Sequence, residues 1–354
     1  MDESTVPFYE RYRTPLIVVT VAVVFILFAV FVLDINMISV LVNGLQVGAV
    51  YSLVALGLAL VYKATRVLNF AQGELGTVPA FLVFLILVNG DRSVEIDIGT
   101  LSTSKLLLAT LIAIVVGAVL AVLVNVLVVQ RLADASPVTS LVATAGVALL
   151  FSSAELIFFE AKARKFPRFV EGSPCFARDA EGFCTSPLAF GGVVVPWHTI
   201  IVIAVLAVAA ALLAVFFRTP PGVALLATAQ EPFAAELHGI SVRSMSTLAW
   251  GTAGALAAIG GVLGAGVFEA ISPGLMTTTF LIPAFTAAVL GGITSMVGAV
   301  VGGLLLGITV AFANSFVLAQ NLTSVLPGPP QIATFLVLLL VLLVRPRGLL
   351  GKEA

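Results

Sequence analysis

Long apolar runs separated by short polar stretches make up most of the sequence. Ten such runs can be delimited, at residues 15–33, 37–61, 68–88, 106–129, 138–158, 197–217, 244–268, 276–290, 297–317 and 332–344. Most of them approach or exceed the roughly 20 residues with which an α-helix crosses about 30 Å of hydrocarbon. The alternating segments of about ten residues that build a transmembrane barrel are missing. The pattern therefore predicts an all-α, polytopic transmembrane helical bundle of about ten spans, in a single domain over residues 1–354.

Two of these runs need a separate interpretation. The run at 276–290 is short and is interrupted by Pro283, which predicts a broken or re-entrant helix. Such backbone is tolerated in a membrane only where it is buried in protein or lines a cavity. The run at 15–33 follows a long acidic segment, and no small-residue cleavage site comes after it, so we expect a retained, extra N-terminal span and not a cleaved signal peptide.

Pairs of glycines with three residues between them recur inside the runs. The pairs are Gly44 and Gly48, Gly260 and Gly264, Gly298 and Gly302, and Gly303 and Gly307. Because glycine lets two helix backbones approach closely, such pairs are typical of helix–helix contacts in membranes. They predict packing faces and not a ligand site.

The distribution of Lys and Arg predicts the orientation. Ten spans place both termini on the same side, and with the N-terminus inside, ten of the 17 Lys and Arg residues fall inside and seven outside. Five of those seven lie in the long loop at 159–196, and charges in long loops influence orientation little. Both termini are therefore predicted to be cytoplasmic, with an extracytoplasmic loop at 159–196 and a cytoplasmic loop at 218–243.

Both cysteines, Cys175 and Cys184, lie in the 159–196 loop. A disulfide between them would persist in an oxidising compartment outside the cytosol, in agreement with this orientation. The alternative is two unpaired thiols. No metal site is expected here, because no histidine lies within 13 residues of either cysteine.

Composition narrows the function classes. The chain is 60% hydrophobic and 10% charged, against about 25% charged in soluble domains. Its net charge is −1 and no basic run stands out, so nucleic acid is not an expected partner. Metalloprotease, hydrolase and phosphate-loop motifs are absent from the sequence, and we predict neither an enzyme nor a cofactor. If ATP drives this protein, another polypeptide binds the ATP.

The most polar stretch near a membrane run is 65–77, which contains Asn69, Gln72 and Glu74. Ionisable residues inside a membrane are expensive and are functional hypotheses by default, here for a pathway or gating role. The alternative for Glu74 is service in the first turn of a helix, where the helix dipole favours a carboxylate. Thr286 and Thr294 are further pathway candidates, although hydrogen bonding within the bundle is the simpler interpretation.

Residues 218–243 separate two apolar runs and are too charged to lie in hydrocarbon. Pro232 suits the first position of a short helix, and Gly239 suits the left-handed residue that ends it. Phe233 and Leu237 then lie on one side, one turn apart. The helix either rests on the membrane surface or its own bundle, or it inserts into a groove on a cytosolic partner.

Four segments resemble the permease subunits of branched-chain amino-acid ABC importers. They are LNFAQGEL at 68–75, the loop at 230–243, the Gly-rich stretch at 284–307 and LLVRPRGLLG at 342–351. The resemblance covers about 36–351 and leaves out the first run and much of the cysteine loop. The class pattern Glu-Ala-Ala-x-x-x-Gly, which docks on the ATPase, is matched by Phe233, Ala234, Ala235 and Gly239, with Phe in place of Glu. Glu231 or Glu236 is then the alternative source of a charge, and Leu237 completes the expected coupling helix.

This resemblance implies a pore subunit in a bacterial-type plasma (inner) membrane that works by alternating access. It implies four kinds of partner besides lipid: two cytosolic ABC ATPases, a second related permease, an extracytoplasmic solute-binding protein and a small substrate, Leu, Ile or Val. Two alternatives remain open. One is the same type of permease for urea, short amides or another small solute, and the other is a secondary transporter that uses Glu74 for ion coupling.

Overall fold

The computed structural model describes residues 35–91, 96, 102–132, 135–178, 184–345 and 348–350. Within these residues, seven helical stretches are long and apolar enough to cross a membrane, by length and composition. They are α2 (Met37–Thr65), η2 with α3 (Phe70–Gln72 and Glu74–Leu87), α4 with η4 (Thr103–Leu127 and Val129–Leu132), α5 (Pro137–Phe159), α6 (Trp197–Phe216), α9 (Val242–Phe268) and α11 (Met296–Ala319).

Two further predicted spans are shorter helices. They are η5 with α10 (Met276–Leu281 and Ile282–Gly291) and α12 (Pro329–Val344). At 1.5 Å per residue, each extends about 24 Å, less than the hydrocarbon thickness of about 30 Å. The predicted span at 15–33 lies outside the described residues. The helical membrane class is thus confirmed, with seven full-length spans in the described part of the chain where about ten were predicted for the whole.

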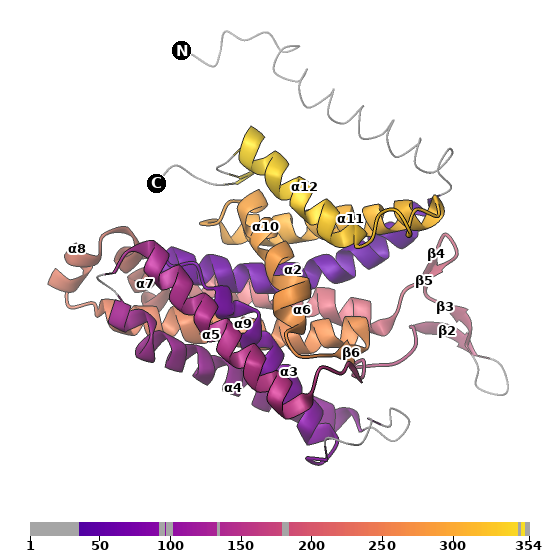
Figure 1. The fold of residues 1–354 in the computed structure, drawn as a ribbon, viewed down its shortest axis with the longest axis horizontal. Helices are drawn as coiled ribbons and strands as arrows, with labels where there is room; N and C mark the ends of the chain where they lie inside the picture. Colours follow the sequence, from indigo (N-terminus) through magenta and orange to yellow (C-terminus); the bar gives the residue numbers. More distant parts are fainter. Residues whose placement is uncertain are drawn as a thin grey trace, which may run out of the picture.

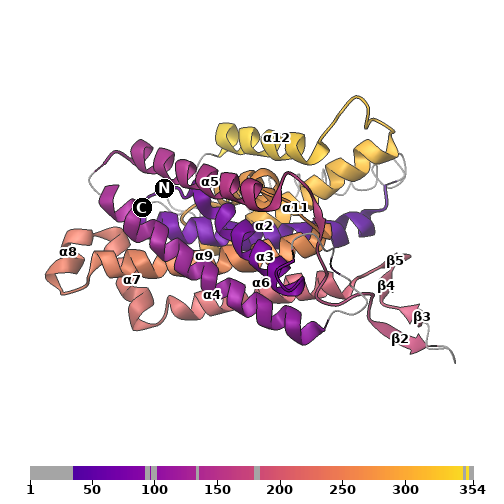
Figure 2. The ribbon, with the colours of Figure 1, turned by 60° about the horizontal axis from the view of Figure 1, so that its bottom comes forward.

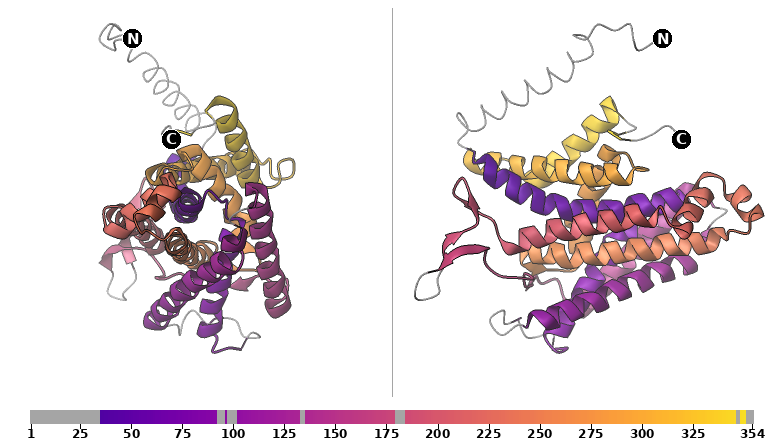
Figure 3. Two further views of the ribbon diagram at one scale, coloured as in Figure 1. Left: turned by 90° about the vertical axis from the view of Figure 1, so that its left-hand side faces the viewer. Right: turned by 180° about the vertical axis from the view of Figure 1, so that it is seen from behind.

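The long helices run between two opposite ends of the molecule (Figure 1). One end, here called the α8 end, carries α7 (Pro220–Gln230) and α8 (Pro232–Leu237) in the connection from α6 to α9. The other, here called the β end, carries short antiparallel pairs. They are β2 (Cys175–Arg178) with β3 (Cys184–Pro187), β4 (Ala189–Phe190) with β5 (Val193–Val194), and β1 (Arg164–Lys165) with β6 (Ala270–Ile271). Figure 3 shows both ends from behind.

Helix α2 lies at the centre of the bundle, with α6, α9, α10 and α11 packed around it (Figure 2). Every residue from 48 to 61 is buried. This helix is hydrophobic on all sides, as expected of a helix that is covered by protein all round. The remaining helices are therefore held by their contacts with α2 or with its neighbours.

Glycines bring α2 and α11 into backbone contact. A Cβ atom at Gly48 would lie 2.8 Å from the carbonyl oxygen of Gly303, and a Cβ at Gly44 would lie 2.6 Å from the Cα atom of Ile308. Gly307 meets the backbones of Gly44 and Gly48 in the same way. Real Cβ atoms do not approach backbone this closely, so the packing face predicted from these glycine pairs is confirmed.

The irregularity predicted around Pro283 is a change of helical winding. Residues Met276–Leu281 form a π-helical turn, and the helix continues without interruption through Ile282–Gly291, with Pro283 in its first turn. The chain then reverses at Gly292, whose φ is +101°, and Gly298 of α11 packs directly on Gly291. The segment is thus one continuous helix, so the predicted break at Pro283 is wrong: a proline is tolerated in the first turn of α10. π-Helical turns of this kind are frequent at functional positions.

Helices α4, α5 and α12 expose large apolar side chains. Leu111 of α4 is 62% exposed, Leu149 of α5 is 70% exposed and Leu343 of α12 is 76% exposed. Contiguous apolar surface is rare on proteins surrounded by water, whereas a surface that faces hydrocarbon or another membrane subunit is expected to be apolar. The burial pattern therefore agrees with the membrane class derived from the sequence.

Candidate functional site

The segment at 218–243 folds as a helix–turn–helix at the α8 end. Pro220 and Pro221 begin α7, and Pro232 begins α8, as their fixed φ allows at the first turn of a helix. Gly239 has a φ of +79°, and its N–H donates to the Glu236 carbonyl oxygen at 2.9 Å. The helix starts and ends where the prolines and this glycine predict.

The apolar side of α8 is uncovered. Phe233 is 70% exposed and Leu237 is 74% exposed, whereas Ala235 is buried against the rest of the chain. Glu231 and Glu236 are exposed beside them. Exposed aromatic and aliphatic side chains one helical turn apart, with acidic neighbours, match the composition of a helix that docks in a groove.

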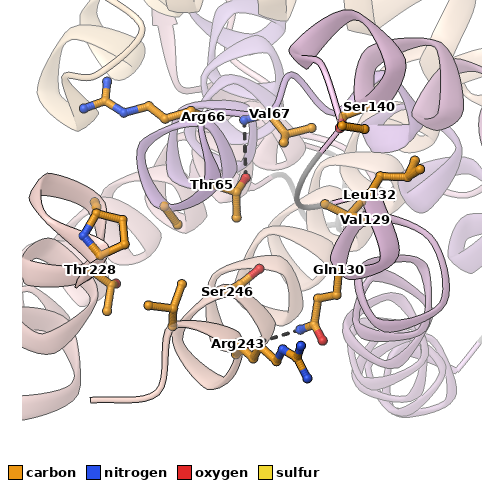
Figure 4. Close-up of a pocket in the computed structure, with 15 residues that line it drawn as sticks. Thr65, Arg66, Val67, Val129, Gln130, Leu132, Ser140, Thr228, Arg243 and Ser246 are labelled. Carbon is orange, nitrogen blue, oxygen red and sulfur yellow. Dashed lines mark hydrogen bonds between the residues drawn. The ribbon is translucent and has the colours of Figure 1, made fainter. Parts of the chain in front are cut away.

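A cavity of about 360 Å³ lies under this segment, between the ends of α2, η4, α5, α7, α8 and α9. Figure 4 shows Gln130 of η4 reaching α9, where its amide donates to the carbonyl oxygen of Arg243 at 3.2 Å. It also donates to the Thr247 hydroxyl at 3.0 Å. Arg66 and Arg243 extend in different directions, so they do not form a common anion site. The cavity therefore lies beside the contacts that α7 makes with α2 and α9.

The side-chain amides of Asn69 and Gln72 form hydrogen bonds within the protein. Asn69 begins η2, accepts a hydrogen bond from the Ala71 N–H at 3.0 Å, and donates its amide to Gln72 Oε1 at 3.0 Å. Gln72 donates to the carbonyl oxygen of Ala253 in α9, also at 3.0 Å. The two amides therefore attach η2 to α9, which leaves Glu74 as the unsatisfied polar group of the stretch.

Glu74 is the first residue of α3 and has no exposed surface. Neither of its carboxylate oxygens has a hydrogen-bond partner among the described residues. Its polar neighbours are Thr77, Thr277 at the start of η5, and the carboxyl group of Glu155 in α5. Its position in the first turn of α3 is one in which the helix dipole favours a carboxylate. The neighbouring carboxyl group of Glu155 instead favours a pathway or gating role for Glu74.

Glu155 was not identified from the sequence. It is 4% exposed, its Oε2 accepts a hydrogen bond from the Gly274 N–H at 2.9 Å, and its Oε1 has no partner among the described residues. No Lys or Arg in the described part of the chain forms an ion pair with Glu74 or Glu155. Burying two acidic groups together without a cation is costly. An acidic residue inside the apolar run 138–158 was the available signal, by the same rule that selected Glu74.

The remaining sequence-derived candidates lie elsewhere. Thr286 is buried, and its hydroxyl donates to the Ile282 carbonyl oxygen within α10 at 2.9 Å. Thr294 lies half-buried in the turn between α10 and α11. The structure therefore does not bring these two threonines together with Glu74.

The β end holds a disulfide between Cys175 and Cys184, with their Cα atoms 5.8 Å apart. It closes the β2–β3 hairpin. Among the described residues, no group of three or more His, Cys, Asp and Glu side chains could hold a metal ion.

Comparison with known proteins agrees with this architecture. A family model described as "Branched-chain amino acid transport system / permease component" matches residues 40–345. The high-affinity branched-chain amino acid transport system permease protein BraD of Pseudomonas aeruginosa is 30% identical over 316 residues, which are 88% of this chain and 95% of that protein. The permease protein LivH of Escherichia coli K12 is 28% identical, with 88% and 94% covered.

A more distant relative, a probable branched-chain amino acid transport permease protein LivH, comes from Methanocaldococcus jannaschii. It is 25% identical over 303 residues, which are 85% of this chain and 88% of that protein. The solved structure of PsaBC from Streptococcus pneumoniae aligns at 13% identity over 86% of this chain and 91% of that one, with a TM-score of 0.43, too low to establish a common fold. With a family model spanning nearly all of the helical bundle, this chain belongs to the family of permease components of branched-chain amino acid transport systems.

Proposed function

We propose that this chain is the membrane-spanning pore subunit of an ATP-driven importer for branched-chain amino acids. Membership of the permease family carries the proposal, since the named relatives are permeases of such systems. The sequence contains no phosphate-binding loop, so ATP hydrolysis belongs to separate subunits. The uncovered apolar side of α8 is the surface on which we place one of those subunits.

The proposal includes the finer topology. The chain makes ten spans in a bacterial-type inner membrane, with the α8 end and both termini in the cytoplasm and the β end outside. Its partners are two cytosolic ABC ATPases, a second related permease, and an extracytoplasmic binding protein that delivers the substrate to the β end. The excess of Lys and Arg in the short loops on the α8 side supports this orientation.

Transport then proceeds by alternating access. ATP binding and hydrolysis move the partner subunits, and α8 follows because Phe233 and Leu237 are inserted into them. The movement passes through α7 to α9 and α2, which α7 contacts directly. ATP can shift the two states of the pore only by its different affinity for them. The cavity beneath α7 and α8 supports this proposal as a space into which the segment would move.

Two substitutions in α8 test this proposal. Phe233→Asp places a charge in the docking groove, and Gly239→Pro is incompatible with the φ of +79° at the end of the helix. Each is expected to abolish ATP-driven leucine uptake in proteoliposomes. Since truncation of a buried aromatic anchor costs about 2 kcal/mol or more, Phe233→Asp should also weaken ATPase association at least about 30-fold.

Phe176→Asp is the matched control, because Phe176 is 75% exposed at the opposite end of the molecule. It should leave ATPase association unchanged. Wild-type uptake by either α8 variant at normal expression would show that α8 does not couple the permease to the ATPase.

A secondary transporter is the second candidate, and the buried pair Glu74 and Glu155 is the observation in its favour. Such a protein would take up solute along an ion gradient without ATP or partner subunits. Reconstitution of this chain alone, with proton and sodium gradients in turn, separates the two candidates. Importers for urea or short amides are separated from the main proposal by competition with leucine in the complete complex.

A further inference from the structure

A second cavity, of about 560 Å³, lies near the β end. It is lined by residues of α2, the η5–α10 helix, α11 and α12, together with Arg168, Pro196 and the end of α9. A volume of this size is typical of small-molecule sites. The cavity shares no lining residue with the one beneath α8.

One residue that lines the cavity, Arg168, belongs to a pair of opposite charges. Its partner Glu269 is not a lining residue but directly follows the lining residue Phe268. The guanidinium group of Arg168 forms an ion pair with the carboxylate of Glu269, and both side chains are partly exposed. The Nε–H group of Arg168 is buried and has no hydrogen-bond partner in the described part of the chain. This guanidinium group therefore retains an unused donor.

The interior of the cavity is part amide and part apolar. Gln46 is 8% exposed, and its Oε1 accepts a hydrogen bond from the Thr199 hydroxyl at 2.9 Å. Its amide NH₂ group is then the part of the side chain that would donate to a ligand. Tyr51 packs its ring edge-on against Phe280, and Val47 and Val267 line the same wall. A ligand here would meet amide and hydroxyl groups as well as aliphatic and aromatic surface.

The π-helical turn η5 separates this cavity from the carboxyl pair. Thr278 and Thr279 line the cavity, whereas Thr277, the residue before them, lies beside Glu74. A change in the winding of η5 would therefore alter both places at once. Short π-helical segments are frequent at functional sites, which agrees with this position.

We propose that the cavity binds the zwitterionic head group and apolar side chain of the transported amino acid, with the substrate carboxylate on Arg168 and its ammonium group on Glu269. This inference rests on the proposed function and adds a substrate site to it. The two protein charges form the complement of a zwitterion, and Tyr51, Val47 and Val267 provide the apolar surface that a branched side chain requires. Binding would loosen the Arg168–Glu269 pair and bring the ligand against η5.

Single-charge variants test the site. Arg168→Gln and Glu269→Gln should each raise the KM for leucine about 10- to 100-fold in the complete importer, the effect of losing one hydrogen bond to a charged group. Lys162→Gln, which removes an exposed charge at the same end outside the cavity, is the matched control and should leave KM unchanged. Binding of radiolabelled leucine to the permease–ATPase complex without binding protein provides a readout independent of transport. There, 4-methylpentanoate and 3-methylbutylamine, which each lack one charge, should compete poorly.

A charge exchange separates ligand binding from a purely structural ion pair. Arg168→Glu combined with Glu269→Arg restores an ion pair of reversed polarity, so a structural role predicts recovery of leucine uptake, whereas the proposed site predicts none. Ala311→Phe fills the cavity without removing any polar group and should also abolish leucine binding. If the charge variants fold poorly, Ala311→Phe still tests whether leucine binds in the cavity.

The outcomes are distinguishable from those for the proposed function. If the wild-type importer transports leucine and the charge exchange or Ala311→Phe leaves the KM unchanged, this inference is wrong and the proposed function stands. The same conclusion follows if the cavity holds only lipid, since the leucine-binding signal of the complex would then be absent. A wild-type importer that transports no branched-chain amino acid overturns both.

Discussion

Glu74 and Glu155 lie beside each other inside the bundle, and a change to glutamine removes the ionisable group while keeping the shape of the side chain. If the two carboxyl groups act in gating, Glu74→Gln or Glu155→Gln should lower leucine uptake about tenfold or more, the size expected for losing an interaction with a charged group. The folded protein should remain as stable as wild type, because glutamine keeps the shape of the side chain and its oxygen can still accept the hydrogen bond that Gly274 donates to Glu155. Uptake and the midpoint of thermal unfolding, measured on the same preparations, test both statements.

Glu171→Gln, at an exposed position in the loop before α6, is the control for the loss of a carboxylate and should leave uptake unchanged. If both interior variants transport at the wild-type rate, the carboxyl pair has no role in gating. Glu155 would then serve only to join α5 to the Gly274 backbone.

The residue types in the site could be predicted, but their partners could not. An acidic or amide side chain inside an apolar run is visible in the sequence, and this selected Asn69, Gln72 and Glu74. The partner of Gln72 is a backbone carbonyl 181 residues away in α9. Such a distance along the chain carries no periodic signal, because it depends on how the helices are arranged. Glu155 carries the same signal as Glu74, since it is an acidic residue inside the apolar run 138–158.

The contact between α2 and α11 makes a prediction at the level of helices. Gly48→Ala places a methyl group 2.8 Å from the Gly303 carbonyl oxygen, where only backbone could move to accommodate it. The expected loss is about 1–3 kcal/mol in the free energy of unfolding, as for overpacking elsewhere. Gly146→Ala in α5 is the matched control, since a Cβ at Gly146 meets nothing within 4 Å. Denaturant unfolding in detergent compares the two, and equal stability of both variants would contradict close backbone packing.

The positions of the helices along the chain could be predicted from the sequence, but a change of helical winding could not. Apolar runs located the helices within a few residues, and Pro220, Pro232 and Gly239 located α7 and α8, because proline and glycine constrain φ locally. The π-helical turn in Met276–Leu281 has no such local cause in the sequence. The sequence therefore does not show where the winding of this helix changes.

For the whole molecule, the sequence predicts that helices cross the membrane but not their order around α2. All the spans are apolar on most sides, so periodicity does not distinguish the central helix from those that face outward. The structure does so through burial, with residues 48–61 of α2 covered and α4, α5 and α12 largely exposed. The exposed helices are where lipid and the proposed second permease would lie.

The orientation of the whole molecule is testable through the disulfide at the β end. Cys175 and Cys184 are the two cysteines of the chain, and no free cysteine accompanies them. After mild reduction of intact cells, a membrane-impermeant maleimide should label them, because the 159–196 loop is predicted to lie outside. Glu236→Cys, in a chain with Cys175→Ser and Cys184→Ser, places one thiol at the exposed tip of α8 and should be labelled only after lysis. The reverse pattern would put the α8 end outside the cell, where no ATPase could reach it, and would remove the physical basis for coupling through α8.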